Sequence, residues 1–217
     1  VDDSLAMAQA IYEFGVQNSS LDLGRLATEW CREAGSFLTR KAFLQHKLSG
    51  FIAGSNPAPK PVDVVLYGFG RIGRLVAREL IAQEGRGEQL RLRAIVVRGG
   101  GAEDLEKRAS LLRVDSIHGP FPGTVSADSA KNALIVNGRP VLMINAAKPE
   151  DIDYTAYGFS NVLVIDNTGA FRDREALARH QQSKGCTKVL LTAPGKGIPN
   201  IVFGVNHDQD WGDETIF

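Results

Sequence analysis

The sequence predicts an α/β protein: a doubly wound, mostly parallel sheet preceded by a small all-helical extension. Three stretches of the chain predict this organisation. Residues 62–217 alternate short β-branched runs with stretches of helical period, a pattern typical of a parallel sheet. Residues 1–53 carry apolar side chains three and four positions apart, which predicts helices alone. Residues 54–61 have proline at every second position from 57 to 61 and predict a stiff extended linker.

The composition indicates an ordinary globular protein. Of 217 residues, 43% are hydrophobic and 23% are charged, and 25 basic residues balance 25 acidic ones. A net charge of zero argues against a nucleic-acid or membrane-surface partner, and no run of about 18 apolar residues is present that would span a membrane. The two cysteines lie far apart, which favours a reducing compartment and hence a cytoplasmic location. The chain starts at Val1 without a signal-like segment, and we expect it to be part of a longer chain.

The extension is expected to form two or three amphipathic helices. Residues 2–4 suit the start of the first helix, and Ser20 or Asp22 the start of the second. The apolar stripe includes Trp30 and Phe37, so another surface must cover it. Packing on the neighbouring domain is the simpler expectation, and a regulatory interaction surface is the alternative.

In the larger part of the chain, strands and helices are expected to alternate. Residues 137 and 138 are Asn-Gly, the strongest short hairpin signal, and add an antiparallel hairpin to the sheet. The expected strands are 62–67, 90–97, 134–136, 140–144, 162–165, 188–191 and 201–205. The expected helices are 71–84, 102–113 and 172–184.

A glycine-rich turn follows the first strand, and its sequence Gly68-Phe69-Gly70-Arg71-Ile72-Gly73 matches G-x-G-x-x-G. The first glycine permits a tight turn, the second lets a pyrophosphate approach the backbone, and the third lets helix and strand pack closely. The helix starts near Arg71, so its unpaired N–H groups and positive dipole end face the phosphates. The pattern predicts a Rossmann-type site for NAD or NADP. The alternative is a tight turn whose glycines serve packing only.

Five segments in the same order resemble the phosphorylating glyceraldehyde-3-phosphate dehydrogenase family over about residues 62–210. They are Tyr-Gly-Phe-Gly-Arg-Ile-Gly-Arg at 67–74, Asp-Ser-Ile-His-Gly at 115–119, Val-Asn-Gly-Arg-Pro at 136–140, Asn-Thr-Gly-Ala-Phe at 167–171, and Lys-Val-Leu-Leu-Thr-Ala-Pro at 188–194 with Val-Phe-Gly-Val-Asn-His at 202–207. The helical extension has no part in this resemblance. The resemblance implies an enzyme that oxidises an aldehyde phosphate through a cysteine thioester and passes hydride to NAD or NADP. It also implies a small-molecule substrate, glyceraldehyde 3-phosphate or erythrose 4-phosphate, and a homo-oligomer when full length.

The resemblance assigns cofactor contacts to three of these segments. Residues 68–73 would hold the pyrophosphate, with backbone donors at Arg71 and Ile72. The contacts along the cofactor, near its ribose and nicotinamide end, would be Thr168, Gly169, Phe171, Thr192 and Ala193. Both of these later segments directly follow apolar strands, and ligands of open α/β sheets bind beyond the carboxyl ends of strands. The alternative for residues 168–169 is a strand-to-helix turn capped by threonine.

The choice between NAD and NADP depends on the end of the second strand. An NAD-specific site normally places Asp or Glu there, but residues 96–101 are Val-Val-Arg-Gly-Gly-Gly. Without a carboxylate, a 2′-phosphate meets no repulsion, and Arg98 offers a planar bidentate donor. The sequence therefore predicts use of both cofactors or a preference for NADP. The alternative is that Arg98 is solvated and other contacts bind NAD.

No catalytic residue is expected within these 217 residues. The nucleophile of the family lies in a Ser-Cys-Thr-Thr-Asn segment that this sequence does not contain. Cys186 precedes a strand and is expected at the amino edge of the sheet, whereas Cys31 lies on the apolar stripe of the extension, so both are predicted to be inert packing residues. The chain by itself is therefore expected to be inactive.

No metal site is expected, because His46, His118 and His180 have no metal-ligand spacing with Cys or acidic residues. His207 is predicted to hold a turn. A second hypothesis remains open for the function: a non-catalytic NAD(P)-binding sensor or regulatory module, in which the helical extension would transmit the ligand state.

Overall fold

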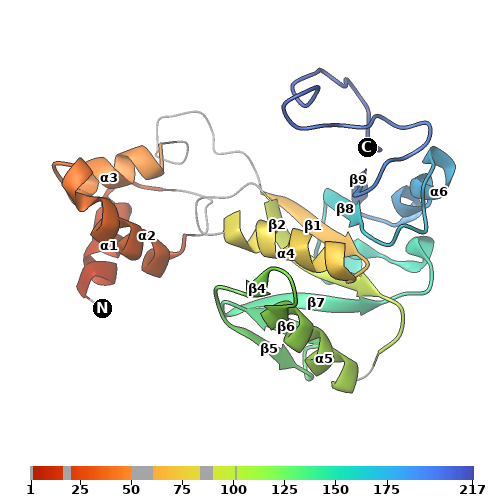
Figure 1. Ribbon diagram of the computed structural model, residues 1–217, viewed down its shortest axis with the longest axis horizontal. Coiled ribbons are helices and arrows are strands. Elements are labelled where there is room, and N and C mark those ends of the chain that lie inside the picture. Colours follow the sequence, from red (N-terminus) through yellow and green to blue (C-terminus); the bar gives the residue numbers. More distant parts are fainter. Residues whose placement is uncertain (1, 17–20, 50–60, 84–89, 101) are drawn as a thin grey trace. The chain divides into compact units, whose positions relative to one another are not determined.

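The computed structural model describes residues 2–16, 21–49, 61–83, 90–100 and 102–217 (Figure 1). The chain divides into two compact units. The first comprises residues 1–61 with 80–91, and the second comprises 62–79 with 92–217. The predicted linker at 54–61 lies outside the described residues, apart from Pro61. Within the described ranges, no helix combines the length and apolar character needed to cross a bilayer.

The first unit is built on three helices. They are α1 (Asp2–Glu13), α2 (Leu23–Glu33) and α3 (Arg40–Lys47), with a 3-10 turn η1 (Ala34–Ser36) after α2. Asp22 caps α2 as predicted, since its carboxylate accepts from Arg25 N at 2.8 Å. Thr39 caps α3 by accepting from Ala42 N at 3.1 Å.

The apolar stripe of this unit packs on the unit's own helices. Phe43 is fully buried, and the rings of Trp30 and Phe37 meet it edge-on with centroids 5.5 and 5.4 Å away. Met7 of α1 is buried in the same cluster. Cys31 is exposed and is not part of this cluster, so its predicted packing role is wrong; its sulfur lies 3.9 Å from Asp3 Oδ2 on α1.

The second unit contains the predicted sheet, and the fold class is confirmed. The strand order is β5-β6-β7-β2-β1-β8-β9. The parallel strands are β1 (Val62–Tyr67), β2 (Leu90–Val97), β7 (Arg139–Asn145), β8 (Val162–Asp166) and β9 (Cys186–Leu191). An antiparallel edge is formed by β5 (Val125–Asp128) and β6 (Ala133–Val136), with the Asn137-Gly138 turn leading from β6 into β7 as predicted. A two-residue pair, β3 (Val114–Asp115) and β4 (Gly119–Pro120), lies outside this sheet.

The order of the strands defines where a ligand would bind. The chain runs from β1 to β2 and β7 on one side of β1, and then crosses to β8 and β9 on the other side (Figure 1). Such a reversal leaves a crevice at the carboxyl ends of β1 and β8. The connections are α4 (Arg71–Gln83), α5 (Ala102–Arg113), the 3-10 turns η2 (Pro149–Asp151) and η3 (Tyr154–Tyr157), α6 (Arg174–Ala178) and the 3-10 turn η4 (Arg179–Gln182).

Two predicted elements differ from the structure by more than two residues at an end. The helix expected at 172–184 is shorter and tightens into η4 at Arg179. The reason is tertiary: Arg179 pairs with both oxygens of Glu150 at 2.7 and 3.0 Å, and the next residue, His180, is drawn into the core to contact Asp166. These bonds hold the last turn in a narrower form than an α-helix.

The strand expected at 201–205 is absent, and that prediction is wrong. These residues form exposed turns, in which Val202 N donates to the side chain of Asn206 at 2.6 Å. The place beside β9 is taken by the last residues of the chain instead. Val189 N donates to Thr215 O at 2.8 Å, and Leu191 N donates to Phe217 O at 2.7 Å.

An ion pair between Glu214 and Arg174 helps to hold this last segment, and we expect the contribution of that ion pair to stability to be lost in acid. Glu214 accepts two bonds from Arg174, at 3.0 and 2.6 Å, and two from the backbone at 215 and 216. The Arg174 guanidinium, helped by these N–H groups, lowers the pKa of Glu214 from 4.5 to about 2. A folded-state pKa below the unfolded value stabilises the protein above pH 4.5 and loses that effect as the pH falls toward 2.

Glu214→Gln should therefore destabilise the protein at pH 6 and much less at pH 3, as measured by urea unfolding at both values. Glu175→Gln, at an exposed glutamate of α6, is the matched control and should behave like the unsubstituted protein. A Glu214→Gln effect that is equally large at both pH values would contradict the role of the charge.

Candidate functional site

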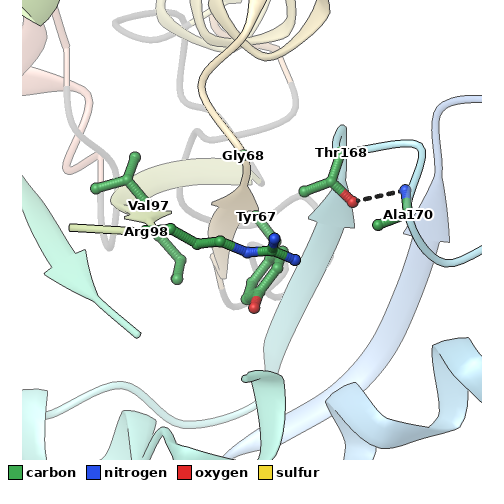
Figure 2. Close-up of a pocket in the computed structure, with 7 residues that line it drawn as sticks. Tyr67, Gly68, Val97, Arg98, Thr168 and Ala170 are labelled. Carbon is green, nitrogen blue, oxygen red and sulfur yellow. Dashed lines mark hydrogen bonds between the residues drawn. The ribbon is translucent and has the colours of Figure 1, made fainter. Parts of the chain in front are cut away.

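A pocket of about 260 Å³ lies where β1, β2 and β8 end. Its walls come from three strand ends, and the lining residues are Tyr67, Gly68, Val96, Val97, Arg98, Thr168 and Ala170 (Figure 2). Backbone bonds hold the strand ends together: Gly68 N donates to Val96 O at 2.9 Å, and Asn167 N donates to Tyr67 O at 2.8 Å. The pocket thus occupies the crevice that the strand order creates.

The three glycines of the G-x-G-x-x-G turn differ in what a side chain at each position would contact. Gly68 has φ +96°, and a Cβ there would lie 2.8 Å from Thr168 Cγ2. At Gly73 a Cβ would collide with the backbone carbonyl oxygen of Gly68, so the first turn of α4 rests directly on the end of β1. At Gly70 a Cβ would meet nothing within 4 Å. The packing of the protein therefore accounts for two of the glycines, and the third borders open space.

The open space beside Gly70 faces the start of α4. The first helical bond returns from Arg74 N to Gly70 O at 3.1 Å, so the N–H groups of the preceding turn have no partner within the helix. Arg71 and Ile72 are exposed at this end, while the Phe69 side chain is buried and anchors the turn. Backbone donors and a positive dipole end at an uncovered turn fit a phosphate group.

Arg98 is the charged residue of the pocket lining. It is exposed and makes no hydrogen bond or ion pair with any residue that the structure describes. Figure 2 shows its side chain extending from the end of β2 toward Tyr67, opposite Thr168. No carboxylate is among the lining residues. Burial raises the pKa of Tyr67, and the positive charge of Arg98 partly offsets that shift.

Asp166, at the end of β8, organises the opposite wall. Its carboxylate accepts from Thr168 N and Thr168 Oγ1, both at 2.7 Å, and lies 2.8 Å from His180 Nε2. Its backbone oxygen accepts from Thr192 N and Thr192 Oγ1, both at 3.1 Å. One residue thus connects the two predicted cofactor segments, at 168–171 and 192–193. Sequence reasoning missed Asp166 and His180, although an acid at the end of an apolar strand was visible.

The structure brings some predicted site residues together and leaves others apart. Gly68, Arg98 and Thr168 line the pocket, whereas the rest of the turn, at 69–73, follows Gly68 in the chain and is not among the lining residues. Phe171 is buried in the core and does not line the pocket; its ring centroid lies 6.1 Å from that of Tyr67, which does. Thr192 bonds to Asp166, and Gly169 and Ala193 are not among the lining residues. The lining residues that sequence reasoning did not name are Tyr67, Val96, Val97 and Ala170.

Cys186 lies away from the pocket. Cys186 is the first residue of β9, at the amino end of that strand, whereas the pocket lies at the carboxyl ends. Burial raises the pKa of the Cys186 thiol to about 12, which keeps it protonated at neutral pH. His207 accepts from Gly204 N at 3.1 Å in a turn, as predicted, although no strand precedes it. No group of three or more potential metal ligands occurs in the part of the chain that the structure describes.

Comparison with known proteins gives a consistent result. A sequence model described as "Glyceraldehyde 3-phosphate dehydrogenase, NAD binding domain" matches residues 62–174. A glyceraldehyde-3-phosphate dehydrogenase-like protein of Pseudomonas aeruginosa is 46% identical over 218 residues, which cover 100% of this chain, including the helical extension, and 47% of that protein. The chloroplastic glyceraldehyde-3-phosphate dehydrogenase A of Zea mays is 36% identical over 202 residues, covering 92% of this chain and 46% of that protein. The glyceraldehyde-3-phosphate dehydrogenase of Thermotoga maritima is 38% identical, covering 70% and 43%. The chain thus spans less than half the length of these relatives.

Proposed function

This chain belongs to the glyceraldehyde-3-phosphate dehydrogenase family, and its residues 62–174 match the family's NAD-binding domain. We therefore propose that the pocket binds a nicotinamide dinucleotide. The pyrophosphate lies against the start of α4, where Arg71 and Ile72 offer backbone N–H groups. The observation that supports this most directly is Gly70, whose missing side chain serves no contact of the protein itself. Space for a close approach of phosphate to the backbone accounts for that glycine.

The adenosine ribose occupies the pocket between Arg98 and Thr168. In dinucleotide sites of this fold, the end of the second strand contacts the ribose 2′-position. Arg98 stands at that end of β2, and no carboxylate among the lining residues would repel a phosphate. We therefore propose that the protein accepts NADP as well as NAD, or prefers NADP.

This proposal predicts that Arg98→Ala weakens NADP binding selectively. Charge-assisted hydrogen bonds contribute about 1.5–3 kcal/mol each, so we expect a loss of about tenfold or more for NADP and less than about threefold for NAD. Calorimetric titration with both cofactors measures the difference. The NADP affinity of Arg98→Lys, which keeps the charge but not the planar fork, should lie between those of Arg98→Ala and the unsubstituted protein. Equal losses for both cofactors, or an unsubstituted protein that binds NAD at least about tenfold more tightly than NADP, would contradict it.

The complete reaction is proposed to be the oxidation of an aldehyde phosphate through a cysteine thioester, with release of an acyl phosphate. When bound, the nicotinamide supplies the hydride acceptor. The residues of this chain bind and orient the dinucleotide, and they supply no nucleophile, since Cys186 is protonated and lies at the opposite edge of the sheet. The thiolate would have to come from outside these 217 residues, and the working protein would be a cytoplasmic homo-oligomer.

Two measurements test this function. Calorimetric titration should show saturable binding of NAD or NADP, and no binding at millimolar cofactor would overturn the proposal. An assay with an aldehyde phosphate and arsenate should be blank for residues 1–217 alone and positive for a protein in which a Ser-Cys-Thr-Thr-Asn segment follows them. Cofactor binding without turnover in that longer protein would favour the sensor hypothesis instead.

A further inference from the structure

A buried polar cluster outside the pocket lining contacts Thr168. Asp166 and His180 are both fully buried, and Asp166 Oδ2 lies 2.8 Å from His180 Nε2. The other carboxylate oxygen accepts from the backbone N and the hydroxyl of Thr168. A buried carboxylate is costly unless its lone pairs are satisfied. Here the carboxylate of Asp166 meets three donor groups, two from Thr168 and one from His180.

The surroundings of His180 define which of its ring nitrogens meets Asp166. The rings of Tyr67 and Phe171 pack edge-on against the imidazole, with centroids 4.7 and 5.3 Å away. Its Nδ1 atom is buried and has no hydrogen-bond partner among the described residues. The nitrogen that faces the carboxylate is Nε2, which donates to Asp166.

This arrangement decides what Thr168 can offer to a ligand. Its hydroxyl proton points at Asp166, and the same oxygen accepts from Ala170 N at 3.1 Å (Figure 2). The remaining lone pair can only accept a hydrogen bond. A sugar hydroxyl, which can donate, is complementary to that oxygen, whereas a phosphate oxygen is not. Arg98, which reaches toward Tyr67 from the β2 side in Figure 2, has the opposite preference, because a guanidinium only donates.

We propose that Asp166 and His180 are positioning residues that hold the Thr168 hydroxyl as an acceptor for the 3′-hydroxyl of the adenosine ribose. This inference rests on the proposed function. The 3′-hydroxyl is the donor common to NAD and NADP, and Arg98 faces the 2′-position. Thr168 therefore binds both cofactors equally well, and Arg98 distinguishes between them.

A double-mutant cycle tests the inference by calorimetric titration of the intact protein that carries this chain with NAD and with NADP. Thr168→Val removes the hydroxyl at nearly constant shape, and we expect a loss of about fivefold for both cofactors. His180→Met removes the donor to Asp166 and should cost about the same. His180→Gln, which has nearly the same shape as Met, places an amide N–H where Nε2 lies and should stay within about twofold of the unsubstituted protein. The double variant with Thr168→Val and His180→Met should bind no more weakly than Thr168→Val alone.

The inference is overturned if the losses of cofactor affinity multiply in the double variant. It is also overturned if His180→Gln binds the cofactor as weakly as His180→Met, because both outcomes indicate a merely structural role. A ligand-side measurement covers the case in which His180→Met does not fold. An NAD analogue that lacks the 3′-hydroxyl should bind the unsubstituted protein about fivefold more weakly than NAD and show no further loss in Thr168→Val. A further loss there also overturns the inference. An unsubstituted protein that binds neither cofactor overturns the proposed function itself, which is a different result from binding with independent effects.

Discussion

Gly70→Ala is expected to weaken NAD binding by about 100-fold, because it blocks two charge-assisted hydrogen bonds worth about 1.5–3 kcal/mol each. A Cβ at this position meets no protein atom within 4 Å, so the free protein has room for it. The same Cβ would stand in the space through which a phosphate reaches the exposed start of α4. Calorimetric titration with NAD measures the loss.

The fold should tolerate this substitution. Residue 70 has no positive φ, and the added methyl group touches nothing, so the free energy of unfolding should stay within about 0.5 kcal/mol of that of the unsubstituted protein. Urea unfolding without cofactor provides this control. A Gly70→Ala protein that binds NAD as tightly as the unsubstituted protein would show that no phosphate approaches this turn.

Gly73→Ala, three residues further on, should have the opposite profile. Its Cβ would collide with the carbonyl oxygen of Gly68, a backbone atom at the end of β1 that no side-chain rotation can move aside. Helix α4 would have to shift away from the sheet, and overpacking against backbone costs about 3 kcal/mol. We expect a lower urea midpoint in the absence of any ligand, with cofactor affinity falling as a secondary consequence.

The two variants are each other's matched control, since they make the same chemical change in one turn. Gly70→Ala should affect binding with little effect on stability, and Gly73→Ala should affect stability first. If both variants lost stability to the same extent, the open space beside Gly70 would not be a ligand space. If neither did, the close contact of α4 with β1 would not exist in solution.

Much of the site was predictable because its signals are local. The turn at 68–73 joins a strand to a helix, and short-range sterics place glycines there whatever the rest of the chain does. The hairpin at Asn137-Gly138 is of the same kind, since the turn type selects its residues. The predictions of β2 and α5 agree with the structure to the residue, because hydrophobic period and flanking glycines mark both of these elements.

The relations that sequence reasoning missed connect residues distant along the chain. Asp166 and His180 are 14 residues apart and belong to different elements, and only the packing of η4 on β9, the neighbour of β8 in the sheet, brings them into contact. The apolar run at 201–205 has the composition of a strand, but a strand forms only where an edge is free. Residues 215–217 occupy that edge of β9 instead.

The sequence by itself determined where the main strands and helices alternate along the chain, the glycine-rich turn after the first strand and the absence of an acid after the second strand, because each depends on neighbours in the chain. Only the tertiary structure decided which side chains meet beyond the strand ends. It set Arg98 and Thr168 on opposite sides of one pocket and directed the hydroxyl of Thr168 toward a buried carboxylate. The physical reason is that a hydrogen bond between distant residues depends on how the sheet orders its strands, and local propensity does not record that order.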